Sequence, residues 1–144
     1  VVNETELAAT LEGAGIQAED ARTQVEQVEM LAARFEMAVV LTLGARGVLA
    51  CAEGRVYEVA SFPVDAVDTT GAGDTFAGGL AGYLAANAAG GVTFEALKKA
   101  VVYGSVLASY NVEAFSLERL KTVDKAQIES RYDLFRQISQ FEKI

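Results

Sequence analysis

Hydrophobic residues along the chain recur with two different periods, one typical of helices and one typical of strands. Over residues 18–37 the apolar residues Val25, Val28, Leu31 and Phe35 recur at helical spacing, which predicts an amphipathic helix. The run AVVLTLG that follows is β-branched and bounded by glycine, as is typical of a buried parallel strand. GVLACA and RVYEVA predict two more strands, joined by a hairpin-like EGR turn.

Further helices are expected on either side of these strands. The first is a short helix that follows the strand end at residues 1–3 and stops at the GAG of residues 13–15. The others cover residues 73–89, 94–109 and 125–141. Asn3 and Thr5 can cap the first of these helices, Thr93 the third and Asp124 the last. Helices that alternate with short apolar strands predict an α/β layered fold with a largely parallel sheet, both faces of which are covered.

Composition narrows the class of protein. The 144 residues suffice for one domain with a core, and no apolar run approaches the ~20 residues of a membrane span. With 12 basic and 20 acidic residues the net charge is −8, which argues against nucleic acid as a partner. Cys51 is the single cysteine and lies in an apolar run, so we expect a buried thiol, no intramolecular disulfide and a cytoplasmic protein.

The sequence contains no histidine, which removes several classes of catalytic site. Ser-His-Asp and Cys-His triads, histidine bases and ordinary histidine-rich zinc sites are all excluded. Any catalysis must use carboxylates, backbone dipoles, lysine, arginine or a metal bound through oxygen. The groups able to do this gather in one stretch, VDTTGAGDTFAGG, residues 67–79.

This stretch places a glycine-rich turn directly before a strongly predicted helix. The amides of Gly71, Ala72 and Gly73 are expected to point outward unpaired, and the helix dipole adds about half a positive charge there. Glycine also lets a ligand approach the backbone closely. The turn is therefore a candidate site for an anion such as a phosphate.

Two better-known glycine loops do not match the turn. The dinucleotide fingerprint G-x-G-x-x-G/A, started at Gly71, requires a small residue where the chain has Phe76. The P-loop spacing from Gly73 places Gly79 and Leu80 where Lys and then Ser or Thr are required. Both the P-loop and a dinucleotide-dependent oxidoreductase are therefore disfavoured.

Asp74 lies inside this cradle, and two interpretations of it are open. Because a helix N-terminus stabilises the charged form of a carboxyl group, we expect Asp74 to be ionised at neutral pH. Asp74 can simply cap the helix. Alternatively, it orients and deprotonates a hydroxyl beside a phosphate held by residues 71–73, because phosphoryl transfer depends mostly on positioning and charge neutralisation.

The motif DTTGAGDTFAGG resembles the second signature of the ribokinase family, the PfkB-type carbohydrate and nucleoside kinases, which read D-T-x-G-A-G-D. Other stretches resemble the family in the same order. VNETE matches its N-x-x-E element with Asn3 and Glu6, and LTLGARGVLA matches its T-x-G segment with Thr42 and Gly44. Residues 103–116 fall where the family closes the adenine pocket and a monovalent-cation loop. The resemblance covers nearly all of the chain and implies a ribokinase-like three-layer α/β/α fold.

The resemblance implies a role for each residue of the central motif. Asp74 would be the catalytic base that takes the proton from the acceptor hydroxyl. The amides of residues 71–73 would form the anion hole for the migrating γ-phosphoryl group. Asp68 and Thr70 would lie beside the potassium-type cation that many members hold.

Simpler interpretations stay open for several matched residues. The resemblance associates Asn3 and Glu6 with magnesium and the phosphates, but they also fit a helix cap and a solvated carboxylate of the first turn. It places Thr42 and Gly44 against the nucleotide, but both also fit ordinary strand ends. Asp68 also fits a residue whose carboxylate caps the backbone amides of a tight turn.

The chain departs from the family in two respects. Its last loop, SYNVEAFS at residues 109–116, has no glycine, whereas the family usually has one near its cation site. Members of the family are also much longer, and the resemblance covers only their C-terminal, nucleotide-binding half. We therefore expect residues 1–144 to lack the N-terminal half and the substrate lid, and so to lack a complete sugar site.

The resemblance thus implies an ATP-dependent phosphotransferase that moves the γ-phosphoryl group to a hydroxyl of a sugar or related carbohydrate. Its ligands would be ATP or ADP, Mg²⁺, a K⁺-type cation and a small sugar-like substrate, with neither nucleic acid nor membrane as a partner. The alternative is a non-catalytic remnant that binds nucleotide, or nothing, and self-associates as a homo-oligomer. The missing half would leave sheet edge and helix faces exposed, which favours such association.

Overall fold

The structure is a computed structural model that describes residues 1–17 and 23–139. Its elements follow in the order β1 (Val2–Asn3), α1 (Glu4–Gly13), α2 (Gln24–Phe35), β2 (Val39–Thr42), the 3-10 helix η2 (Gly44–Arg46), β3 (Val48–Ala52), β4 (Arg55–Val59), α3 (Ala72–Asn87), α4 (Phe94–Asn111), the 3-10 helix η3 (Leu120–Thr122) and α5 (Lys125–Ile138). This order confirms the predicted helices and strands. The beginning of the helix expected from residue 18, and Phe141 at the end of the last one, lie outside the described residues.

Within the described residues, four strands form one mixed sheet in the order β1-β2-β3-β4. β1 pairs with β2 in parallel, whereas the pairs β2–β3 and β3–β4 are antiparallel. The α/β class is confirmed, but the expected largely parallel sheet is not found among these strands. The connections at residues 43–47 and 53–54 are too short for a crossover, so each returns the chain antiparallel to the preceding strand.

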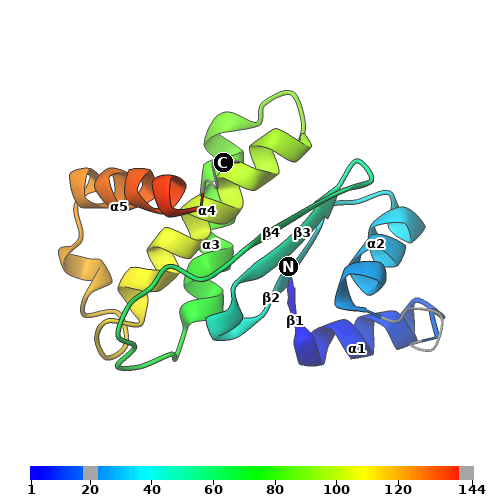
Figure 1. The fold of residues 1–144 in the computed structure, drawn as a ribbon, viewed down its shortest axis with the longest axis horizontal. Helices are drawn as coiled ribbons and strands as arrows, with labels where there is room; N and C mark the ends of the chain where they lie inside the picture. Colours follow the sequence, from blue (N-terminus) through cyan, green and yellow to red (C-terminus); the bar gives the residue numbers. More distant parts are fainter. Residues whose placement is uncertain (18–22, 140–144) are drawn as a thin grey trace, which may run out of the picture.

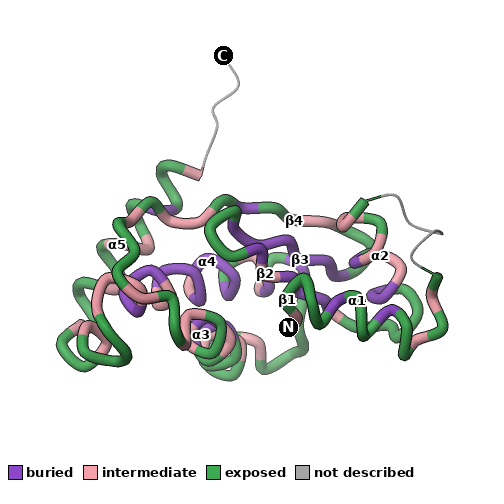
Figure 2. Tube along the Cα trace, turned by 90° about the horizontal axis from the view of Figure 1, so that it is seen from below, coloured by how far each residue is buried: buried purple, intermediate pink, exposed green. Residues whose placement is uncertain are grey.

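Helices cover both faces of the sheet, which gives three layers (Figure 1). Val39 and Leu41 pack in a core with α1 and α2, whereas Val40 between them packs in a second core with α3, α4 and α5. This alternation follows from the two-residue period of a strand. Cys51 in β3 is buried as expected, and burial raises the pKa of its thiol. Figure 2 shows the buried residues gathered along the inner strands and α4.

Capping side chains define where most of the helices begin. The expected caps Asn3, Thr93 and Asp124 each accept a hydrogen bond from a backbone amide of the first turn. Thr5 lies inside α1 rather than at its cap. In the part of the chain that the structure describes, none of the helices is long and apolar enough to cross a membrane.

Helices α3 and α4 approach closely because two glycines face each other where the helices meet. A Cβ atom on Gly79 would lie 2.8 Å from Cδ1 of Leu107 and 3.1 Å from Cα of Gly104. A Cβ atom on Gly104 would lie 2.7 Å from the carbonyl oxygen of Phe76. Because a Cβ at Gly104 would meet backbone, a larger residue there would push the helices apart, and this contact limits the distance between α3 and α4.

Replacing Gly104 by Ala should therefore destabilise the chain, because the added methyl group meets a backbone carbonyl. Overpacking of this kind costs about 1–3 kcal/mol, so we expect a lower Tm in thermal denaturation followed by circular dichroism. Gly82→Ala is the matched control, since it is exposed on α3 with open space around its Cβ and should keep or raise Tm. An unchanged Tm for Gly104→Ala would contradict the close packing.

Candidate functional site

Residues from distant parts of the sequence meet at one end of the sheet, where the parallel strands β1 and β2 have their carboxyl ends; this end is called the carboxyl edge below. β1 ends at Asn3 and β2 at Thr42, and these two residues are partners in the parallel register. Figure 1 shows that the carboxyl ends of both strands and the N-terminal end of α3 lie along the same edge, at the bottom of the view. Ligands of open α/β sheets bind outside the carboxyl ends of strands, so this edge is the place to seek a site.

A pocket of about 520 Å³ opens at this edge, between η2, the loop of residues 61–66, α3 and α4. Thr42 and Gly44 line it from the end of β2, and Ala72 and Gly73 line it from the start of α3. Two separate motifs of the sequence therefore contribute to one cavity. Most of the remaining wall is apolar or small, and includes Phe62, Pro63, Val64, Ala66, Phe76, Ala108 and Val112.

The turn before α3 exposes backbone amides. Gly71 is the N-cap and has φ 77° and ψ 2°, a left-handed conformation that glycine adopts without strain. The amide of Ala72 donates to the carbonyl oxygen of Thr69 at 3.2 Å. Among the described residues, the amides of Gly71 and Gly73 have no acceptor. These two amides and the positive end of the α3 dipole can hold an anion, whereas the Ala72 amide is shared with the turn.

Asp74 is exposed in the first turn of α3, directly after Gly73. The N-cap of α3 is Gly71, and Asp74 is an acidic residue of the first turn that makes no capping hydrogen bond with its side chain. Within the described part of the chain its carboxylate has neither a hydrogen-bond nor an ion-pair partner. The carboxylate is therefore available to a ligand beside the exposed amides.

Asn111, the last residue of α4, joins that helix to the turn before α3. It is 0% exposed. Its Nδ2 donates to the carbonyl oxygen of Thr70 at 2.9 Å, and its Oδ1 accepts from the hydroxyl of Thr75 at 2.9 Å. Because Thr70 and Thr75 flank residues 71–74, one amide holds the turn from both sides. The sequence pattern does not single out Asn111, and its only signal is an amide at the end of a largely apolar helix.

Asp68 caps backbone amides, as the simpler interpretation predicts. Its Oδ1 accepts from the amide of Thr70 at 3.0 Å, and its Oδ2 accepts from the amide of Ser116 at 3.2 Å. These hydrogen bonds, first those from Thr70 and then that from Ser116, hold the pKa of the Asp68 carboxyl below its ordinary value. The carboxylate thereby ties the loop before α3 to the loop after α4.

Asn3 and Glu6 form the capping box of α1. Oδ1 of Asn3 accepts from the amide of Glu6 at 2.9 Å, and Oε2 of Glu6 accepts from the amide of Asn3 at 2.9 Å. The second carboxylate oxygen of the exposed Glu6 has no partner in residues 1–17 and 23–139. In those residues there is also no group of three or more acidic, histidine or cysteine side chains that could hold a metal. One free carboxylate oxygen nevertheless fits Mg²⁺, which binds one or two carboxylates together with substrate phosphates.

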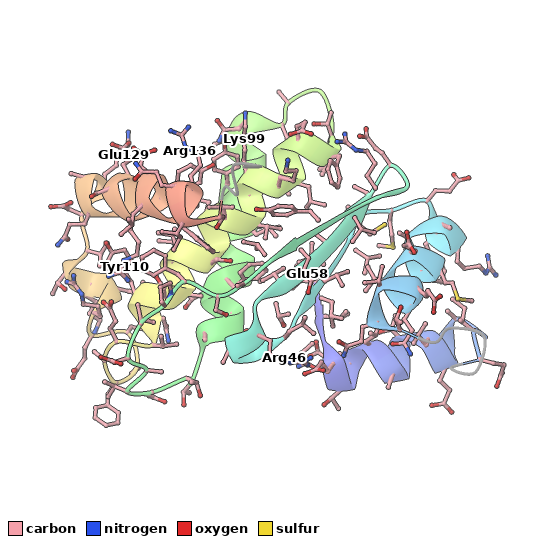
Figure 3. All side chains as sticks on the ribbon, in the orientation of Figure 1. Arg46, Glu58, Lys99, Tyr110, Glu129 and Arg136 are labelled. Atoms are coloured by element: carbon pink, nitrogen blue, oxygen red, sulfur yellow. The ribbon has the colours of Figure 1, made fainter. Side chains whose placement is uncertain are left out.

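Arg46 ties the turn after β2 to α1. Figure 3 shows Arg46 at the sheet edge beside α1, and its guanidinium forms an ion pair with Glu4. A hydrogen bond from Gln24, and then one from Arg46, lower the pKa of the Glu4 carboxyl. Both partners are well exposed, so this pair contributes little to stability. The pair connects η2, which carries Gly44, to the first turn of α1.

Asp68 should titrate below its ordinary pKa of 3.8 in the folded chain. A carboxyl with a lowered pKa adds stability above its unfolded value, and that contribution is lost as the pH falls through the folded value. ¹³C NMR of the Asp68 carboxyl carbon measures the midpoint directly, with the urea-unfolded chain as reference. Asp68→Asn should also weaken the dependence of Tm on pH in the range below the ordinary pKa of the Asp68 carboxyl. A titration midpoint in the folded chain at or above that of the unfolded chain would contradict the hydrogen bonds from Thr70 and Ser116 to Asp68.

Comparison with known proteins shows the family and the fold. The family profile described as pfkB family carbohydrate kinase matches residues 1–121. A curated fructokinase from Escherichia coli is 49% identical over 51 residues, which cover 35% of this chain and 17% of the relative. The solved ribokinase of Thermotoga maritima superposes with a TM-score of 0.70 and 25% identity, over 91% of this chain and 40% of that chain.

A solved fructokinase from Vibrio cholerae O395 gives a similar match, with a TM-score of 0.69 and 26% identity over 91% of this chain and 40% of that chain. That structure is in the fructose, ADP and calcium ion bound form. A double mutant of the same enzyme, with 25% identity, a TM-score of 0.69 and the same coverage, is in the fructose, ADP and potassium ion bound form. The chain therefore spans about a sixth of the curated fructokinase and two fifths of the solved enzymes.

Proposed function

The chain belongs to the pfkB family of carbohydrate kinases, and we propose that it is the C-terminal, nucleotide-binding part of an ATP-dependent kinase. The enzyme would phosphorylate a hydroxyl of a sugar or related carbohydrate. The observation that carries the proposal is the pocket in which Thr42 and Gly44 meet Ala72 and Gly73. Two motifs that the family resemblance associates with the nucleotide and its phosphates thus line the same cavity.

The shape of the pocket suits a nucleotide. Its apolar wall, which includes Phe62, Phe76 and Val112, can cover a base and a ribose. Its volume of about 520 Å³ lies within the range typical of small-molecule sites. At the start of α3 the exposed amides of Gly71 and Gly73 offer hydrogen bonds to phosphate oxygens. The ADP-bound form of the Vibrio cholerae fructokinase supports a nucleotide as a ligand of the complete fold.

Asp74 is the proposed catalytic base. As the acceptor hydroxyl oxygen attacks the γ-phosphorus, Asp74 accepts its proton, and the bond from the γ-phosphorus to the bridging oxygen breaks to release ADP. The amides of Gly71 and Gly73, with the α3 dipole, stabilise the negative charge of the phosphoryl group in transfer. The carboxylate suits this role because it is exposed next to those amides, and no other described group occupies it.

The site can also receive the Mg²⁺ that accompanies a nucleotide triphosphate. Glu6 would be its protein ligand through the carboxylate oxygen that is not bonded to Asn3. The capping box holds the Glu6 side chain at the start of α1, one strand away from the pocket residue Thr42. When bound, the ion neutralises charge on the phosphates and leaves the remaining positioning to the protein.

The acceptor pocket is proposed to lie in protein outside this chain. The solved relatives are more than twice as long as the region that matches, so a large part of their fold has no counterpart here. The alternative, a non-catalytic remnant that self-associates, is favoured by β1, which has a partner on one side only among the described strands.

Gly73→Ala should weaken nucleotide binding without unfolding the chain. Its added Cβ meets nothing within 4 Å, so the fold tolerates it and helix propensity increases. The methyl group nevertheless stands where a phosphate must approach the backbone. We expect about a tenfold or greater loss of ADP affinity in isothermal titration calorimetry with Mg²⁺, equivalent to at least about 1.4 kcal/mol.

Gly78→Ala is the matched control for this experiment. Gly78 lies in the same helix with equally open surroundings, but it does not line the pocket. This variant should bind ADP as the wild type does. Equal ADP affinity in Gly73→Ala and the wild type would contradict the phosphate site, and a wild-type chain that binds no ADP would contradict the nucleotide site altogether.

Asp74→Asn should abolish turnover in a complete kinase that contains this chain. Loss of a general base lowers kcat by about 10²–10⁴-fold, whereas the KM for ATP should stay nearly unchanged because the amides of residues 71–73 remain. Asp133→Asn is the control, since Asp133 is exposed on α5 and pairs only weakly with Arg136 at 3.8 Å. A full-rate Asp74→Asn enzyme would refute the assignment of the base.

A further inference from the structure

Three N–H groups point at the oxygen atoms of the loop before α3. The amides of Thr70 and Ser116 donate to the two oxygens of the Asp68 carboxylate, at 3.0 and 3.2 Å. Nδ2 of Asn111 donates to the carbonyl oxygen of Thr70 at 2.9 Å. Asp68 and Thr70 are the residues that the family resemblance places beside a potassium-type cation. Each of these oxygens therefore already faces a hydrogen with partial positive charge.

Two carbonyl oxygens near the end of α4 are engaged as well. A potassium-type cation replaces its hydration shell with oxygens, such as backbone carbonyls, that are free to face it. The carbonyl oxygen of Val112 already accepts from the amides of Val67 at 2.7 Å and Asp68 at 3.2 Å. The carbonyl oxygen of Tyr110 accepts from the amide of Glu113 at 3.3 Å. The oxygens of Asp68 and Thr70 are thus already engaged within the protein, and at the Thr70 carbonyl the engaged donor is the buried Asn111 amide.

Asn111 is placed where its side-chain amide can hold the turn in position, as such an ion would. Its Nδ2 holds the carbonyl oxygen of Thr70, the residue immediately before the N-cap Gly71. Its Oδ1 holds the hydroxyl of Thr75, one residue after Asp74. Asn111 does not line the pocket, so it acts on the site only by positioning the turn.

The residues next to Asn111 are anchored firmly. The hydroxyl of Tyr110, labelled in Figure 3, donates to the carbonyl oxygen of Gln127 in α5 at 2.9 Å. The guanidinium of Arg131 lies 3.4 Å from the centre of the Tyr110 ring and pairs with Glu113 at 2.7 Å. Arg131 is only 16% exposed, so this pair is shielded from solvent. The C-terminal end of α4 is thus a rigid base from which the Asn111 amide reaches the turn.

We propose that the buried amide of Asn111 takes the place of the monovalent cation, so that the anion-binding turn keeps its shape without potassium or sodium. This inference rests on the proposed function, in which the turn holds a nucleotide phosphate. It makes Asn111 a positioning residue rather than a catalytic one. Nucleotide binding by this chain is then independent of the monovalent cation in solution.

Asn111→Asp tests the inference with the smallest possible change. The variant keeps an oxygen to accept from Thr75, but it replaces the Nδ2 donor with a carboxylate oxygen that faces the Thr70 carbonyl. At a pH where the new carboxyl group is ionised, the two oxygens repel each other and a cation between them relieves the repulsion. Asn87→Asp is the matched control, because Nδ2 of Asn87 also donates to a carbonyl oxygen, that of Tyr83 at 2.9 Å, but at an exposed site.

The experiment measures Tm and ADP affinity for residues 1–144 in potassium, sodium and tetramethylammonium chloride at one ionic strength. We expect the wild type and Asn87→Asp to show no specific dependence of either quantity on the cation. Asn111→Asp should have a lower Tm and about a tenfold weaker ADP affinity in tetramethylammonium, the loss expected from one unmade buried hydrogen bond. Potassium or sodium should recover most of both losses.

A wild-type Tm or ADP affinity that rises specifically with potassium would overturn the inference, because a cation bound to the folded state stabilises it by mass action. So would an Asn111→Asp variant that loses nothing in tetramethylammonium, or one whose loss potassium does not recover. If Asn111→Asp does not fold, the wild-type series alone decides. A chain that binds no ADP in any salt contradicts the proposed function, whereas its Tm series still tests the role of Asn111.

Discussion

The buried amide of Asn111 bonds at the same time to the Thr70 carbonyl and the Thr75 hydroxyl, and the geometry of the site depends on this contact. It connects the end of α4 to the beginning of α3, where the exposed amides and Asp74 lie. The same two helices pack through Gly79 and Gly104, which leaves no room for a side chain between them. The position of the turn proposed to bind the anion is therefore set by helix packing as much as by the sheet.

The sheet contributes the other wall of the pocket, at the carboxyl end of β2. β2 buries both of its faces, and at its carboxyl end the chain turns through η2, so that Thr42 and Gly44 line the cavity. Arg46 pairs with Glu4 and holds that turn against α1. The capping box of α1 in turn holds Glu6 beside the same edge. Contacts made for local stability thus bring together the groups proposed to bind nucleotide, phosphate and metal.

Much of this could be predicted from the sequence, because periodicity and capping act over a few residues. Asn3 and Asp124 begin helices as expected, and the T-x-G and G-A-G segments meet in one pocket. What could not be predicted depends on contacts between distant residues. The second hydrogen bond to Asp68 comes from Ser116, 48 residues away, and Asn111 acquires its contacts only when α4 packs on α3. The roles of Asp74, Asn3, Glu6 and residues 71–73 in catalysis and binding stay predictions.

The most direct test of the nucleotide site is a two-dimensional ¹⁵N–¹H NMR titration of the chain with ADP and Mg²⁺. The account predicts saturable shifts centred on the amides of Gly44, Gly71 and Gly73, with the same pattern in potassium and in tetramethylammonium chloride. The chemical shifts of the α2 amides, on the opposite face of the sheet, should not change. An absence of saturable shifts, or shifts centred on α2 instead of the turn before α3, would contradict it.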